Sequence, residues 1–286
     1  MRFQQKGAEM KSQEFIFHYT TIETLALILK SRKLRFNRLD QVDDLEEAQT
    51  CVDIKFGQFY FASCWSEESD ENIALWHMYS GGMTGVRLQV PKYPFRNISV
   101  KTPDWWRNAF KEAEFVSPLS LDELSGATYM IAPFFRENWF AGPVRYVDDV
   151  SSAYEASIKK TSLANGDTEF RYLDQGSIAK VKSKLWAFQG EYRFTLATYP
   201  IPLDGRNVAE ENQPFDMTRV LQSWQAGDNH GVTYIDVPLA DEVFDSLVVR
   251  MGPRCSLGKI ATVEAILKAW APNATLQLSH LLIGQK

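Results

Sequence analysis

The chain has 286 residues, of which 45% are apolar and 23% charged, a composition typical of a globular protein with a sizeable core. It carries 31 basic and 36 acidic residues, a formal net charge of −5. Proteins that coat nucleic acid through its phosphates usually carry a basic surplus. Nucleic acid is therefore not the expected partner, unless a local basic groove is hidden by the acidic total.

The cysteines and the N-terminal segment indicate where such a chain resides. Cys51, Cys64 and Cys255 form neither a C-x-x-C pair nor a disulfide framework, which favours a reducing compartment. Residues 1–13 are polar and lack the apolar stretch of a signal peptide. No segment approaches the roughly 18 apolar residues that span a bilayer. We therefore expect a cytoplasmic protein without membrane association.

The first predicted element is a strand over 14–19. Its period-2 alternation places His18 and Thr20 on the face opposite Phe17 and Tyr19. Residues 20–23 read Thr-Thr-Ile-Glu, a capping box that predicts a helix ending in the basic run 30–33.

Short strands dominate the rest of the chain. Alternation and turn residues predict strands over 34–37, 59–65, 85–90, 144–147, 191–197, 246–251 and 275–280. Apolar spacing predicts helices over 69–80, 151–163, 168–184 and 257–270, with a turn at Asn165-Gly166. Residues 91–142 are interpreted as an insertion of short helices. Because short strands outnumber β-helix-β units, we predict one α+β domain over 1–286, built on a mixed sheet.

Metal chemistry is not expected. The acidic loop with Asp40, Asp43, Asp44, Glu46 and Glu47 matches no calcium-loop pattern and lacks the central glycine, so we interpret it as a solvated surface segment. The histidines have no H-E-x-x-H or paired-ligand spacing. The chain also lacks a phosphate loop, a G-x-G-x-x-G turn and a G-x-S-x-G elbow.

The candidate site residues are polar or aromatic side chains set among apolar strands and helices. His18 and Thr20 share one face of the first strand, and Trp76 and Tyr79 share one side of the 69–80 helix. Together with the groups described next, they suit a ligand with a flat ring, ribose hydroxyls and phosphates. Each also has a structural interpretation: a hydrogen-bonded histidine for His18, and core packing for Trp76 and Tyr79.

A second group of candidates lies on and before the 191–197 strand. Glu191 and Arg193 share one face of it, where a carboxylate and a guanidinium two residues apart can hold each other in one geometry. Lys184 and Trp186 precede them in the sequence. The structural interpretation of Glu191 with Arg193 is an ion pair that only stabilises the fold.

The chain resembles an uncharacterised bacterial domain family over nearly its whole length. That family opens with an H-Y-T strand and later carries a W-x-x-Y helix, an E-x-R strand and a Gly-Pro turn. The matching positions are His18, Tyr19, Thr20, Ser63, Ser66, Trp76, Tyr79, Gly85, Val86, Val144, Tyr146, Trp186, Glu191, Arg193, Gly252 and Pro253. The chain departs from the family pattern at Asp43-Asp44-Leu45-Glu46, which has no proline, and at Gln189-Gly190.

That family is in turn distantly similar to the ADP-ribosyltransferase fold, a split mixed sheet that grips NAD. The resemblance implies a three-part signature at His18, Tyr79 and Glu191. Glu191 would bind the ribose 2′-hydroxyl and stabilise the charge that develops when the nicotinamide bond breaks. His18 would hold a ribose hydroxyl and Tyr79 would stack on the nicotinamide. Arg193 or Lys184 would orient Glu191 or contact the pyrophosphate.

The leading expectation is an ADP-ribosyltransferase-like protein that cleaves NAD or transfers ADP-ribose from it, with NAD as substrate and no metal. The alternative is a non-catalytic module that binds a nucleotide or a protein partner. The two differ in whether Glu191 faces His18 in an open cleft or is sealed in a salt bridge with Arg193.

A third possibility, an RNA-end-processing transferase on the same fold, would require a basic groove. Lys180, Lys182 and Lys184 are the only local hint of one. At alternating positions of a predicted helix, they are interpreted as a solvated face.

Overall fold

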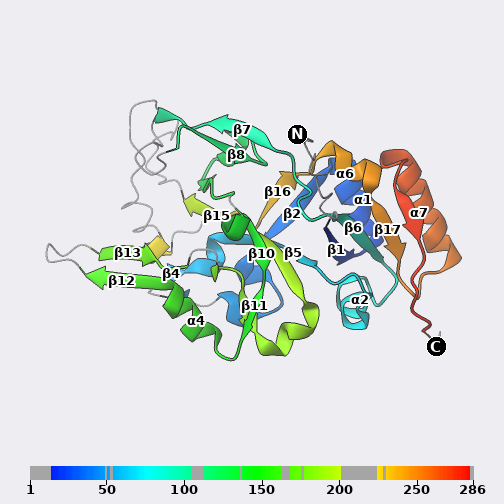
Figure 1. Cartoon of the computed structure of the whole chain (residues 1–286), viewed down its shortest axis with the longest axis horizontal. Coiled ribbons are helices and arrows are strands. Elements are labelled where there is room, and N and C mark those ends of the chain that lie inside the picture. The colour runs from blue at the N-terminus through cyan, green and yellow to red at the C-terminus, as the bar shows by residue number, and fades with distance from the viewer. Residues whose placement is uncertain are drawn as a thin grey trace, which may run out of the picture.

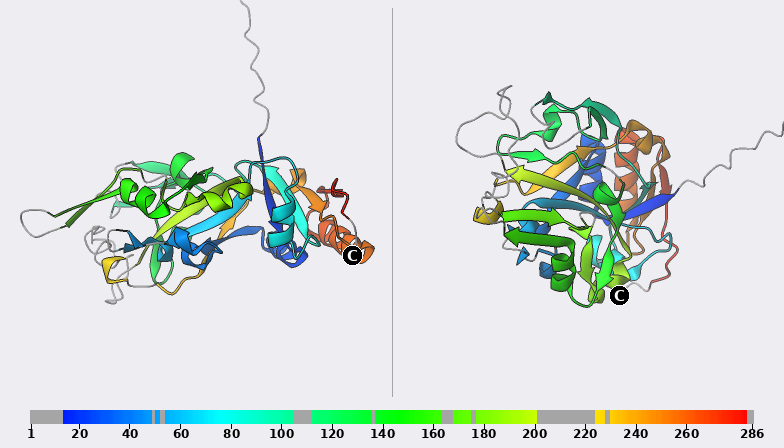
Figure 2. Two further views of the ribbon diagram at one scale, coloured as in Figure 1. Left: turned by 90° about the horizontal axis from the view of Figure 1, so that it is seen from below. Right: turned by 60° about the vertical axis from the view of Figure 1, so that its left-hand side comes forward.

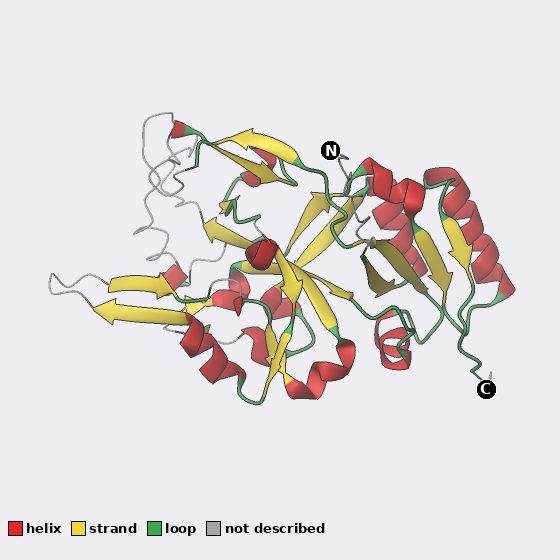
Figure 3. Ribbon diagram, viewed as in Figure 1, coloured by secondary structure: helices red, strands yellow, loops and turns green. Residues whose placement is uncertain are grey.

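The computed structural model describes residues 14–48, 50–51, 54–104, 112–135, 137–162, 168–174, 177–200, 224–227 and 230–283 (Figure 1). Residues 1–13 and the predicted turn at Asn165-Gly166 lie outside this part. The described strands and helices form an α+β fold around a large mixed sheet, which confirms the predicted class (Figure 3). Within the described residues, no helix is both long and apolar enough to cross a membrane.

The main sheet follows the order β10-β15-β5-β1-β6-β17-β18, with β2, β16 and β9 attached beside this path. Its neighbours are antiparallel except β17 and β18, which are parallel. The strands are β1 (Phe15–Thr20), β2 (Lys33–Arg38), β5 (Tyr60–Ser66), β6 (Val86–Pro91), β9 (Tyr129–Ile131), β10 (Ala141–Pro143), β15 (Glu191–Pro200), β16 (Tyr234–Pro238), β17 (Val248–Met251) and β18 (Thr275–Gln277).

The sheet divides along one edge of β5. The other edge of β5 is fully paired with β15, from Tyr60 to Ser66. On the divided edge, β2 pairs at Ala62, whereas β1 pairs only at Ser66. Residues 63–65 therefore face a gap between β1 and β2, with their backbone groups free for other partners.

Helices cover both faces of the β1–β6–β17 part of the sheet. The helix α1 (Ile22–Ser31) contacts α7 (Leu257–Trp270), and both contribute to the main core (Figures 1 and 2). The N-cap of α1 is Thr21, whose hydroxyl accepts from the Thr24 amide, and its side chain thereby satisfies one free N–H of the first turn. On the opposite side, α2 (Ile73–Tyr79) packs Trp76 against Tyr19. The short helix α6 (Asp241–Ser246) contacts β6.

Smaller elements surround the β15 end of the sheet. A parallel pair joins β11 (Arg145–Val147) to β14 (Val181–Ser183), and antiparallel pairs join β12 (Ile158–Ser162) to β13 (Thr168–Tyr172) and β7 (Ile98–Lys101) to β8 (Glu114–Ser117). The remaining pieces are β3 (Thr50–Cys51), β4 (Ile54–Lys55), α3 (Glu137–Phe140), α4 (Val150–Ser157), and the 3-10 turns η1 (Leu39–Gln41), η2 (Leu45–Ala48), η3 (Phe56–Gln58), η5 (Asp122–Leu124) and η7 (Lys184–Gln189).

Three predicted segments were wrong in part or in whole. The helix predicted over 168–184 is absent: its start is β13 and its end is β14. The helix predicted over 151–163 stops at Ser157, and β12 follows it. The segment 91–142 contains strands as well as short helices. In each case strand pairing replaces the local helical pattern: β13 pairs with β12 close by in the chain, whereas β14, β9 and β10 pair with more distant strands.

His230 is a buried histidine that lies outside the predicted site. Its ring stacks on Phe61 with centroids 5.9 Å apart. Its Nδ1 accepts from the Val232 amide, so its Nε2–H donates to the Thr198 hydroxyl at 2.9 Å. Burial, assisted by the charge of Arg38, lowers the pKa of His230 to about 4. The folded protein therefore holds this imidazole neutral where an unfolded chain would protonate it.

This difference predicts a loss of stability in acid. Between pH 6.5 and 4, His230 is protonated in the unfolded chain but stays neutral in the folded protein. The free energy of unfolding should therefore fall as the pH falls. Replacing His230 by Gln, which has no proton to gain, should shrink that loss by about 1–3 kcal/mol. Urea unfolding of both proteins at pH 7 and pH 4.5 measures it. Parallel pH profiles would contradict the assignment.

Candidate functional site

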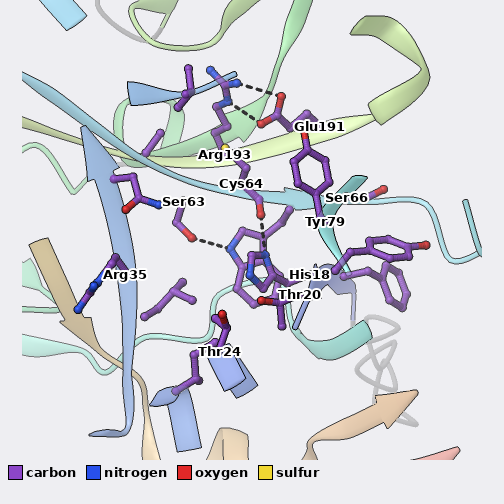
Figure 4. A pocket seen from close by; sticks show the side chains of 18 of the residues that line it. His18, Thr20, Thr24, Arg35, Ser63, Cys64, Ser66, Tyr79, Glu191 and Arg193 are labelled. Atoms are coloured by element: carbon purple, nitrogen blue, oxygen red, sulfur yellow. Dashed lines mark hydrogen bonds and ion pairs between the residues drawn. The ribbon is translucent and has the colours of Figure 1, made fainter. Parts of the chain in front are cut away.

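A pocket of about 580 Å³ lies at the division of the sheet (Figure 4). Its walls come from β1, α1, β2, the edge of β5, the acidic loop and the end of α2. The free backbone edge at residues 63–65 forms part of the wall. The pocket thus exists because β1 and β2 separate from the same strand at different points.

His18 lines this pocket from β1. Its Nδ1 lies 2.9 Å from the carbonyl oxygen of Cys64, on the free edge of β5. Since a carbonyl oxygen only accepts, Nδ1 carries the proton. Burial lowers the pKa of His18, and the hydrogen bond to Cys64 offsets this only in part. The ring is therefore neutral, and its Nε2 presents a lone pair.

The edge of β5 supplies an aromatic wall and a hydroxyl. The rings of His18 and Trp65 lie 5.0 Å apart at an angle of 40°. The indole N–H of Trp65 donates to the hydroxyl of Ser63 at 3.1 Å. That bond holds the indole ring, so the wall beside His18 is rigid and largely apolar.

Tyr79 reaches the pocket from the last turn of α2. Asn72 caps this helix, accepting from the amides of Ala74 and Leu75, and its own N–H donates to the hydroxyl of Tyr19. The hydroxyl oxygen of Tyr79 accepts a 2.7 Å hydrogen bond from Nε2 of Gln189. Burial raises the pKa of Tyr79 well above its usual value, so the phenol keeps its proton.

A buried cluster of two carboxylates and two cations borders the pocket: Glu47, Lys182, Glu191 and Arg193, of which all but Glu47 line it. Arg193 holds Glu191 with two parallel bonds, Nε to Oε1 at 2.9 Å and Nη2 to Oε2 at 3.0 Å. Its other donors reach both oxygens of Glu47 and the carbonyl of Ala179. Lys182 lies 2.9 Å from Glu47 and 3.3 Å from Glu191.

This cluster compensates its own charge. The side chains of Glu47 and Arg193 are 0% and 1% exposed, and that of Glu191 is 7% exposed. Burial acts to raise the pKa of Glu191, but the charges of Arg193 and Lys182 outweigh it and lower the pKa to about 2. Glu191 is therefore an ionised carboxylate with both oxygens already bonded. The adjacent Cys64 has its pKa raised by burial and by Glu191, and it stays a thiol.

The backbone before β15 fixes where Glu191 enters. Gly190 ends η7 at φ +51°, in the left-handed region that favours glycine. A Cβ at this position would lie 2.8 Å from a carboxylate oxygen of Glu68. The amide of Glu191 then donates to the hydroxyl of Tyr146 at 2.9 Å. The left-handed backbone at Gly190 is thus the feature of this turn that favours glycine.

The structure brings most of the sequence candidates to one cavity. His18, Thr20, Tyr79, Glu191 and Arg193 all line the pocket. Trp76 and Lys184 do not.

Two candidates lie elsewhere. Trp76 is fully buried against Tyr19 and donates its indole N–H to Glu71 at 2.9 Å. Lys184 lies in η7 with its side chain 58% exposed, paired with Asp148 at 2.5 Å. Trp76 therefore packs in the core and Lys184 faces solvent, and neither side chain lines the pocket.

Sequence reasoning missed Glu47, Lys182 and Gln189. The acidic loop was interpreted as solvated, yet Glu47 is completely buried, which corrects that interpretation. Lys180 and Lys182 were interpreted as a solvated helix face, yet both are buried, and they flank a strand start instead. Burial lowers the pKa of Lys180 to about 8, and its Nζ donates to the carbonyl of Asn138 at 2.8 Å.

Across the described ranges, no group of three or more His, Cys, Asp or Glu side chains is arranged to hold a metal ion. No protein-family model matches the chain, and no curated protein or solved structure is significantly similar to it.

The buried cluster should dominate stability. Replacing Arg193 by Met removes the fork that holds both Glu47 and Glu191, leaving two buried carboxylates with Lys182 alone. We expect a loss of about 3–5 kcal/mol in the free energy of unfolding, because breaking a buried pair leaves an uncompensated charge. Urea unfolding measures it.

The matched control is Lys184→Met, which breaks a solvent-exposed pair with Asp148. Exposed pairs contribute about 0–1 kcal/mol, so this variant should unfold almost as the wild type does. Equal losses in the two variants would show that the buried cluster has no special role.

Proposed function

We propose that the pocket binds a nucleotide-like ligand, with a flat ring against the aromatic wall and hydroxyls or amide groups at the polar side chains. The observation that carries this proposal is a pocket of about 580 Å³ that combines Trp65 and Tyr79 with a neutral His18 at the division of the sheet. Small-molecule sites typically pair an apolar lining with a few oriented polar groups. NAD is the first ligand to test, in line with the ADP-ribosyltransferase resemblance.

Binding without turnover is the favoured form of this function. In ribosyl transfer, a carboxylate stabilises positive charge that develops on the ribose. The Glu191 carboxylate is buried and bonded at both oxygens by Arg193, with Lys182 also within 3.3 Å. A carboxylate whose charge is already balanced by two cations has little left to offer a transition state. This arrangement supports the non-catalytic alternative.

Cleavage of NAD or transfer of ADP-ribose is the second candidate. One observation favours it: His18, Tyr79 and Glu191, far apart in sequence, line the same pocket. Glu191 is also ionised, as the chemistry would require. For this candidate to hold, ligand binding would have to draw Arg193 or Lys182 away from the carboxylate.

Calorimetric titration with NAD and an assay for released nicotinamide separate the two candidates. We expect NAD to bind and nicotinamide release to stay at the level of a buffer control. The variant His18→Asn should weaken binding about tenfold, because its amide N–H can still donate to Cys64 but the Nε2 acceptor is gone.

Release of nicotinamide would favour the second candidate if it vanished in Glu191→Gln while the melting temperature of that variant showed a folded protein. Absence of NAD binding to the wild type would remove NAD as the ligand. The matched control is Lys184→Met, which alters an exposed residue outside the pocket and should bind NAD as the wild type does.

A further inference from the structure

The hydrogen-bonding direction of Tyr79 is set by a buried residue that does not touch it. Lys182 donates to Oε1 of Gln189 at 2.8 Å, and an ammonium can only donate. The other end of the Gln189 amide is therefore Nε2, which donates to the Tyr79 oxygen at 2.7 Å. With that oxygen accepting from Gln189, the hydroxyl proton of Tyr79 is left to donate elsewhere.

The opposite polarity is set at His18. The Cys64 carbonyl fixes the proton on Nδ1, so Nε2 is an acceptor. Among the described residues, nothing donates to this Nε2, and nothing accepts from the Tyr79 hydroxyl. Both residues line the pocket (Figure 4). The cavity thus offers a fixed donor at Tyr79 and a fixed acceptor at His18.

Charge in the pocket does not disturb this pattern. Glu47 and Glu191 balance Lys182 and Arg193 within the buried cluster. At the rim, Arg35 is paired with Asp236 through two hydrogen bonds of 2.9 and 3.0 Å. A carboxylate entering beside His18 would meet a lone pair, and the other charged residues that line the pocket, Lys33 and Asp43, are exposed and carry opposite charges.

We propose that the pocket selects an uncharged amide-type group, a carboxamide or the equivalent edge of a nucleobase, with its acceptor toward Tyr79 and its donor toward His18. Lys182 and Gln189 act as positioning residues, because they orient the Tyr79 hydroxyl without reaching the ligand. This inference rests on the proposed function, since it names the chemical group of the ligand that the same pocket recognises.

The test compares NAD with nicotinic acid adenine dinucleotide, which replaces the carboxamide by a carboxylate and keeps the rest of the molecule. The wild type should bind NAD at least about tenfold more tightly, the cost of one unmet hydrogen bond in a buried site. His18→Asn should erase most of this preference. Equal binding of the two dinucleotides to the wild type would overturn the proposal.

A double-mutant cycle tests the positioning role. In Gln189→Glu the new carboxylate accepts from both Lys182 and the Tyr79 hydroxyl, so the proton of Tyr79 turns away from the ligand. This variant should lose about as much NAD affinity as Tyr79→Phe, and the double variant should lose no more than either single one. Additive losses would overturn the role of Gln189. Tyr79→Phe adds no buried charge, so it serves the test even if Gln189→Glu fails to fold.

A measurement without ligand separates this inference from the proposed function. Nitrogen chemical shifts of the His18 ring, assigned by their absence in His18→Asn, should show Nδ1 protonated and Nε2 unprotonated at neutral pH. If NAD does not bind, the NAD assignment fails and these shifts decide the polarity. A protonated Nδ1 then sustains the proposal, and a protonated Nε2 overturns it.

Discussion

The buried cluster of Glu47, Lys182, Glu191 and Arg193 is the constraint on which the rest of the site depends. It joins three segments that are far apart in the chain: the acidic loop, β14 and β15. Arg193 and Glu47 are 146 positions apart in sequence, yet their side chains are almost completely withdrawn from water. A group so buried must keep its partners, because each unpaired charge would cost several kcal/mol. The acidic loop is therefore fixed against β15, where it forms one wall of the pocket.

The same cluster also orients a side chain that lines the cavity. Lys182 bonds both carboxylates and also the amide of Gln189, and through Gln189 it orients Tyr79. On the other side, the division of the sheet frees the Cys64 carbonyl, which orients His18. Two features of the fold, an ion cluster and an unpaired strand edge, thus orient two of the hydrogen-bonding groups that line the cavity.

The sequence predicted the regular elements well where local signals were strong. Alternation predicted the core of β1 and β15, a run rich in aromatic residues predicted β5, and apolar spacing with a Gly-Pro turn before it predicted α7. The 168–184 segment was mispredicted because β13 and β14 are held by strand pairing. β12 closely precedes β13, across the predicted Asn165-Gly166 turn, but β14 depends on β11, a partner far away in the sequence. Burial of Glu47 was missed for the same reason: an acidic residue among acidic residues looks solvated until its distant Arg193 is known.

For the candidate site, prediction succeeded for residues whose surroundings are apolar strands. His18 and Glu191 could be singled out because they are polar residues set in strands rich in aromatic side chains, and both line the pocket. Trp76 shares a helix with Tyr79 but faces the core, which i, i+3 spacing alone cannot distinguish from facing a cavity. What the sequence could not supply was the state of each group: which nitrogen of His18 holds the proton, and which charges balance Glu191.

That state decides what the pocket is suited to do. An ADP-ribosyltransferase would need a carboxylate free to face its substrate. In this structure both oxygens of Glu191 accept hydrogen bonds from Arg193, and Lys182 lies close by. The free energy needed to rearrange such a cluster exceeds the free energy that one new hydrogen bond to a ligand would contribute. Among the described residues, the His18 acceptor and the Tyr79 donor line the cavity without a partner for that lone pair or that proton, and both are neutral and held by hydrogen bonds. Neutral groups held in place before binding can recognise a ligand, but they lack the full negative charge that would offset positive charge developing on a ribose. The geometry therefore weighs toward recognition over bond cleavage.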